Sequence, residues 1–175
     1  MNKTVFGAKH LTWWGISGIV AWTAVLVWGC LSHDILLAGL GAAWLFSYFD
    51  MVGYGELIDD TGYEHLTPFY RILQITFQVA LCLMLFVSAG WRAPLVFMVV
   101  WWFGGCDLVY YMLRDEIEEW VQDYNTPEMF NEWMWWTPLG LLRIRITYIL
   151  FLTQAILGWL IALIIGGFEC ITKLF

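Results

Sequence analysis

The sequence predicts an all-α, polytopic membrane bundle that forms a single domain over residues 1–175. Of these residues, 61% are hydrophobic and only 13% are charged. A soluble domain is about 45–50% apolar and about 25% charged, so both departures exclude an ordinary soluble fold. The thirteen Trp residues agree with this class, because tryptophan favours membrane interfaces and aromatic-lined pockets.

Five apolar segments are long enough to cross a bilayer, which takes about 20 mainly apolar residues per helix. The short connections 32–34 and 90–93 predict two antiparallel helical hairpins. Thr-Pro pairs at 67–68 and 137–138 each predict an N-cap followed by proline in the first turn. We expect spans at about residues 11–31, 35–54, 69–89, 94–111 and 138–166.

The distribution of Lys and Arg predicts the orientation of these spans. Arg92 and Lys173 fall on one side of the predicted membrane, and the other six basic residues fall on the side of the N-terminus. Cytoplasmic segments carry the excess of positive charge. We therefore expect a multi-pass protein of the cell membrane with its N-terminus in the cytoplasm and its C-terminus outside. Both long loops, 55–67 and 112–137, are then cytoplasmic.

The second cytoplasmic loop contains an amphipathic pattern. Ile117, Trp120, Val121 and Tyr124 recur at helical spacing, with acidic residues between them. This pattern predicts an amphipathic or interfacial helical segment within about residues 113–136.

A shift of 57 residues aligns two span ends, which suggests an internal repeat. Five identities occur in thirteen positions, and they pair Trp44, Phe46, Asp50, Val52 and Tyr54 with Trp101, Phe103, Asp107, Val109 and Tyr111. A unit of two helices and a loop would make the repeats parallel. The second and fourth spans would then face each other. Chance similarity between membrane helices is the alternative.

Two carboxyl groups are the main candidates for chemistry. Asp50 and Asp107 each lie inside a predicted span, near its cytoplasmic end. Ionisable residues retained in spans usually face the bundle interior or a wet cavity. Tyr54 and Tyr111 follow the aspartates at i+4, a spacing that places each pair on one helix face, where a hydrogen bond can form. We therefore predict Asp50, Asp107, Tyr54 and Tyr111 as catalytic residues; a buried interhelical staple is the structural alternative.

A carboxyl group kept neutral in an apolar pocket can donate a proton, and Trp or Tyr faces can stabilise a carbocation. In this logic the chain is similar to small integral-membrane terpene cyclases, although the similarity lies in composition and charge placement and not in a motif. It implies a cyclase-, isomerase- or lyase-type enzyme that acts on a lipid or isoprenoid substrate by acid–base catalysis.

Aromatic and basic residues near the same membrane face are the candidates for substrate binding. Arginine binds phosphate through two hydrogen bonds, while ordinary anchoring at the interface is its alternative role. The predicted substrate-binding residues are Trp44, Trp101, Arg71, Arg114 and Arg143. No metal ligand set and no cofactor is predicted, although Glu56, Asp59 and Asp60 in the first loop have the hard oxygen donors that suit Mg²⁺.

The sequence is compatible with two other functions and argues against a third. The formal net charge of −7 and the lack of a basic patch argue against nucleic-acid binding. A non-catalytic subunit or scaffold with membrane-protein partners is the first alternative to an enzyme. An ion-coupled transporter is the second, although the paired carboxylates lie near one face and not at the midplane.

Overall fold

A computed structural model describes residues 13–59, 62, 64–114, 136–144 and 147–172. All elements in these ranges are helical, so the predicted all-α class is confirmed for this part of the chain. The amphipathic segment predicted within 113–136 falls almost entirely outside the described residues.

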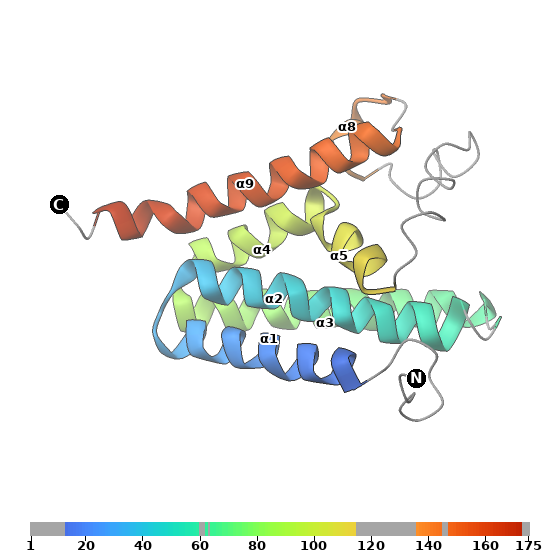
Figure 1. The fold of residues 1–175 in the computed structure, drawn as a ribbon, viewed down its shortest axis with the longest axis horizontal. Coiled ribbons are helices and arrows are strands. Elements are labelled where there is room, and N and C mark those ends of the chain that lie inside the picture. Colours follow the sequence, from blue (N-terminus) through green and yellow to red (C-terminus); the bar gives the residue numbers. More distant parts are fainter. Residues whose placement is uncertain (1–12, 60–61, 63, 115–135, 145–146, 173–175) are drawn as a thin grey trace.

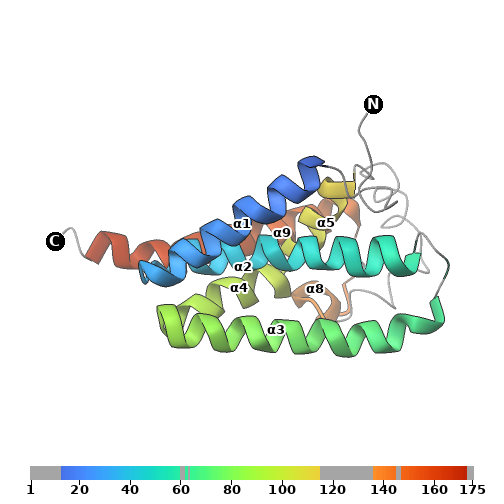
Figure 2. The same cartoon turned by 90° about the horizontal axis from the view of Figure 1, so that it is seen from below.

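The long helices run up and down along one long axis (Figures 1 and 2). The chain begins with α1 (Trp13–Leu31) and α2 (Ile35–Asp50), which continues as a π-helix, η1 (Met51–Asp59). A short 3₁₀ turn, η2 (Glu64–Leu66), leads into α3 (Thr67–Ala89), followed by α4 (Arg92–Trp102) and α5 (Gly105–Arg114). The last described elements are α8 (Pro138–Leu141) and α9 (Tyr148–Thr172).

The described chain contains fewer full-length spans than the five predicted. Three helical stretches are long and apolar enough to cross a membrane: Ile35–Gly55, Thr67–Ala89 and Tyr148–Gly167. The pair Arg92–Trp102 and Gly105–Leu113 makes a fourth if this bent pair is one span. In α1, a helix of 19 residues, the apolar stretch with described side chains is Ile16–Leu31. The protein is therefore a multi-pass membrane protein with three or four candidate spans among the described residues.

The second helix, α2, lies at the centre of the bundle and packs against α1, α3, α4, α5 and α9. Its middle consists of small buried residues, which let neighbouring backbones approach closely. A Cβ on Gly39 would lie 2.5 Å from the side chain of Val96 in α4, and one on Gly41 would lie 2.8 Å from the backbone of Leu26 in α1. The predicted packing of the second span against the fourth is thus present.

The predicted fourth span is broken, contrary to the continuous helix expected over 94–111. Its two halves, α4 and α5, meet at an angle of 66°. Gly104 adopts φ +77° at the break, and Phe151 of α9 packs where its side chain would be. Gln154 of α9 compensates the interrupted helix, because its Nε2 donates to the carbonyl of Phe103 at 3.3 Å.

The predicted fifth span also begins later than expected. Thr137 is the N-cap predicted from the Thr-Pro pair and accepts a hydrogen bond from the Gly140 amide, but it begins only the four-residue α8. The long apolar helix α9 starts at Tyr148. The N-cap prediction at Thr67 is wrong in detail, since Leu66 occupies the N-cap position of α3 without a side-chain cap.

The internal repeat is not identifiable in the structure. Asp50 ends α2 and is followed directly by a π-helix, whereas Asp107 lies in the first turn of α5. Phe46 lies within a continuous helix, but its proposed counterpart Phe103 lies at the α4–α5 break. The two halves therefore differ in backbone geometry at the aligned positions.

Candidate functional site

The candidate site lies where the end of α2 meets the first turns of α3 and the start of α5. We call Asp50, Tyr70, Arg71, Gln74 and Asp107 the carboxylate cluster. Tyr70 and Gln74 are buried, and both aspartates are partly buried. The π-helix directly after Asp50 is relevant here, because π turns inside helices are frequent at functional sites.

Asp50 accepts two hydrogen bonds from α3 at the same carboxylate oxygen. Gln74 Nε2 donates to Asp50 Oδ1 at 2.6 Å, and the Tyr70 hydroxyl donates to that oxygen as well. Arg71 Nη1 donates to Gln74 Oε1 at 2.7 Å, which fixes the orientation of the Gln74 amide. Arg71 also interacts electrostatically with Asp50. The carboxylate therefore faces the bundle interior, between α2 and α3.

Asp107 approaches the same cluster from α5. It interacts electrostatically with Asp50 and with Arg71. The neighbouring Cys106 holds this part of α5 against α2, since its Sγ lies 3.7 Å from the Ala43 carbonyl oxygen. Two acidic side chains that are 57 positions apart in the sequence thus influence each other electrostatically.

The two predicted tyrosine partners of the aspartates make other contacts in the structure. The π-helix carries more residues per turn than an α-helix, so the i+4 relation between Asp50 and Tyr54 no longer places them on one face. The Tyr54 ring instead lies 5.7 Å from the Tyr70 ring and under the Arg71 guanidinium, at 5.1 Å. Tyr111 packs against Phe151 of α9.

Tyr70 and Gln74 were not among the predicted site residues. Their spacing of four places both on one face of α3, and a glutamine inside a 23-residue apolar helix was the available signal. Polar side chains in membrane helices usually bond across to another helix.

The predicted substrate-binding residues are spread over several places. Trp44 stacks on Trp22 of α1 at 4.6 Å, while Trp101 stacks on Trp136 at 4.5 Å. Arg143 is exposed in the connection after α8. Only Arg71 joins the carboxylate cluster. The side chain of Arg114 lies outside the described residues.

The first-loop acids Glu56, Asp59 and Asp60 also lie outside the described side chains, so the magnesium hypothesis stays a prediction. Among the described residues, no group of three or more His, Cys, Asp or Glu is placed to hold a metal ion.

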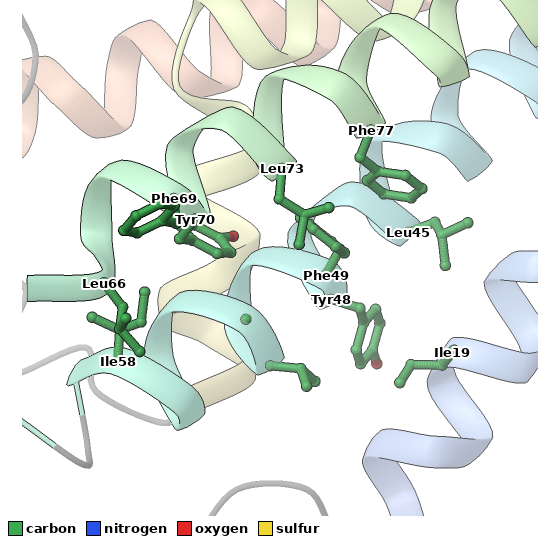
Figure 3. A pocket seen from close by; sticks show the side chains of 12 residues that line it. Ile19, Leu45, Tyr48, Phe49, Ile58, Leu66, Phe69, Tyr70, Leu73 and Phe77 are labelled. Atoms are coloured by element: carbon green, nitrogen blue, oxygen red, sulfur yellow. The ribbon is translucent and has the colours of Figure 1, made fainter. Parts of the chain in front are cut away.

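An apolar pocket of about 580 Å³ lies beside the cluster (Figure 3). Its wall is formed by α1, α2, η1, η2 and α3. It is lined by Ile19, Leu45, Tyr48, Phe49, Val52, Gly53, Ile58, Leu66, Phe69, Tyr70, Leu73 and Phe77. This volume is in the range of small-molecule sites. Tyr70 links the two features, because its ring lines the pocket and its hydroxyl contacts Asp50.

Close packing fixes Tyr70 in this wall. Its ring stacks on Phe49 with a centroid distance of 6.0 Å, and Phe49 in turn lies 4.5 Å from Phe77. Gly53 leaves room for the ring, since a Cβ there would lie 2.5 Å from Tyr70 Cε2.

Comparisons with known proteins add no family to this description: no protein-family model, no curated protein and no solved structure matches the chain.

Proposed function

We propose that this protein is an intramembrane acid–base enzyme acting on a lipid or isoprenoid substrate, with Asp50 and Asp107 as its proton-exchanging groups. One observation carries the proposal. Asp50 lies inside the bundle, where Tyr70 and Gln74 of α3 donate hydrogen bonds to it, and the side chain of Tyr70 separates it from a pocket lined by apolar residues.

The proposed chemistry follows from this arrangement. Two carboxyl groups that repel each other do not both ionise readily, so one of them can keep its proton. The protonated group would add its proton to a carbon–carbon double bond, which forms a carbocation. Aromatic faces such as those of Tyr70 and Phe49 stabilise a cation. Return of a different proton to the carboxylate then completes an isomerisation or cyclisation, with no net change in protons.

The remaining cluster residues have supporting roles in this proposal. The Tyr70 hydroxyl is the polar group between Asp50 and the pocket, and it would pass the proton. Gln74 is a positioning residue, because its amide is held by Arg71 and donates to Asp50. Arg71 is expected at the cytoplasmic face, in the orientation proposed from the basic residues.

Deuterium incorporation tests the proposal for any lipid or isoprenoid substrate. The protein is reconstituted in nanodiscs with a total lipid extract and added polyprenyl lipids, in D₂O. Acid–base catalysis at carbon moves solvent deuterium into the substrate, so one lipid species or its product should gain mass. We expect this gain with the wild-type protein and its loss with Asp50→Asn, whose amide oxygen can still accept from Tyr70.

Asp34→Asn is the matched control, because Asp34 is an exposed aspartate that caps α2 at the other end of the helix. It should deuterate lipid at the wild-type rate. If no lipid gains mass, or if Asp50→Asn acts like wild type, the enzymatic proposal is wrong.

A non-catalytic subunit of a membrane complex is the second candidate. The hydrogen bonds from α3 to Asp50 are also what an interhelical staple requires. This function predicts that a membrane-protein partner co-purifies with the wild-type protein and that Asp50→Asn changes the amount of this partner. No lipid should be chemically altered by either protein. An ion-coupled transporter fits less well, because Asp50 ends α2 instead of lying at the middle of a span.

A further inference from the structure

The apolar pocket is elongated along the helices. On α3 its lining residues extend from Leu66, just before the first turn, to Phe77 near the middle of the helix. On the opposite side they extend from Leu45 in α2 to Ile58 in η1. The pocket therefore runs parallel to α2 and α3, and it occupies only one half of the α3 span.

This length matches one leaflet of a bilayer. At a rise of about 1.5 Å per residue, the eleven-residue separation of Leu66 and Phe77 corresponds to about 16 Å. The hydrocarbon core of a bilayer is about 30 Å thick, so one leaflet contributes about 15 Å. A lipid hydrocarbon chain that lies along the bilayer normal would thus fill the pocket over the full thickness of one leaflet.

The two ends of the pocket differ in their surroundings. Beyond the end near η2, Arg71 follows the lining residue Tyr70 and donates to Gln74 of the carboxylate cluster, which borders the pocket further along α3. The far end is formed by aromatic and aliphatic side chains, where Phe77 packs on Phe46 and Phe49. On the α1 side, Tyr48 points toward Ile19 (Figure 3), and its hydroxyl fills the place of a Gly18 side chain.

We propose that this pocket holds one hydrocarbon chain of a membrane lipid from the leaflet at the Arg71 end. The chain lies parallel to α2 and α3, with its polar end beside Leu66 and its terminal methyl group at Leu45 and Phe77. The binding of a chain in this pocket does not depend on the proposed enzymatic function. The inference rests on that function only where it assigns the bound chain as the substrate, and it then narrows the substrate class to a membrane lipid. Because Tyr70 lies in the half of the pocket nearer to Leu66, the reacting carbon is one in the headgroup half of the chain and not the chain terminus.

Photolabelling tests the position and direction of the chain. Two phosphatidylcholines carry a diazirine on one chain, either near the carboxyl end or near the terminal methyl group. Each is incorporated into nanodiscs with the full-length protein, and labelled peptides are mapped by mass spectrometry. We expect the first probe to label around Ile58 and Leu66 and the second to label around Leu45 and Phe77.

A matched pair of variants separates the pocket from the outer surface. Leu73 lines the pocket and is 55% exposed, whereas its neighbour Ile72 is 66% exposed and is not a lining residue. Leu73→Trp should fill the pocket and reduce labelling at Phe77 several-fold, while Ile72→Trp should leave it close to the wild-type level. Equal effects of the two variants, a reversed order of labelling, or labelling spread over the outer face of α3 would each overturn the proposal.

The Asp50→Asn variant distinguishes this inference from the enzymatic proposal. Chain binding depends on the pocket lining, so this variant should be labelled like the wild type even though it no longer deuterates lipid. Normal labelling without any lipid chemistry in the wild-type protein would leave chain binding supported and the enzyme refuted.

Discussion

The hydrogen bond between Tyr70 and Asp50 allows a quantitative prediction. Interhelical hydrogen bonds in membrane proteins average about 0.6 kcal/mol and reach about 1.7 kcal/mol, whereas bonds to charged groups contribute about 1.5–3 kcal/mol. Tyr70 is only 6% exposed, and the acceptor is a carboxylate that receives a second bond from Gln74. We therefore expect a coupling free energy near the top of the membrane range, about 1.5 kcal/mol.

A double-mutant cycle of Tyr70→Phe and Asp50→Ala measures this coupling. Each variant is unfolded reversibly in mixed micelles and followed by tryptophan fluorescence. The control is Thr76→Val, because the Thr76 hydroxyl bonds to the Ile72 carbonyl within α3 and should not couple to position 50. Independent sites are additive within about 0.3–0.5 kcal/mol, so a Tyr70–Asp50 coupling inside that margin would refute the site geometry.

Three further predictions concern packing, the broken helix and metal dependence. Gly53→Ala should destabilise the protein by about 1–3 kcal/mol, because its Cβ would collide with Tyr70; Gly167→Ala, which meets nothing within 4 Å, should be neutral or slightly stabilising in the same unfolding assay. Gln154→Leu should cost about 1–3 kcal/mol, since it leaves the Phe103 carbonyl unpaired at the α4–α5 break, and wild-type stability would contradict this role. Treatment with EDTA should leave lipid deuteration unchanged, and its loss on chelation would favour the magnesium hypothesis for the first loop.

The general class and the position of most apolar helices followed from the sequence, because a span needs a long apolar run and such runs are visible directly. The interior position of Asp50 also followed from the sequence, because an aspartate that faces lipid costs free energy. Its partners did not, because a prediction from one sequence does not fix the rotation of α3 relative to α2. The i+4 assumption for Tyr54 failed because the residues after Asp50 form a π-helix, which has more residues per turn than an α-helix.

The break between α4 and α5 was missed for a related reason. Gly104 and Gly105 lie inside a continuous apolar run, so the segment satisfied the length criterion although a Gly-Gly pair favours a turn. The break depends on Phe151 and Gln154 of α9, which are distant in the sequence. Contacts from α9 therefore stabilise a bend that the Gly-Gly pair permits locally.

Infrared spectroscopy tests most directly whether Asp50 and Asp107 form the proposed pair of inward-facing carboxyl groups that hold one proton. We expect a carboxylic-acid C=O band at neutral pH that is absent from both Asp50→Asn and Asp107→Asn and present in Asp34→Asn. A spectrum without a protonated carboxyl group, or with a band that survives both substitutions, would contradict it.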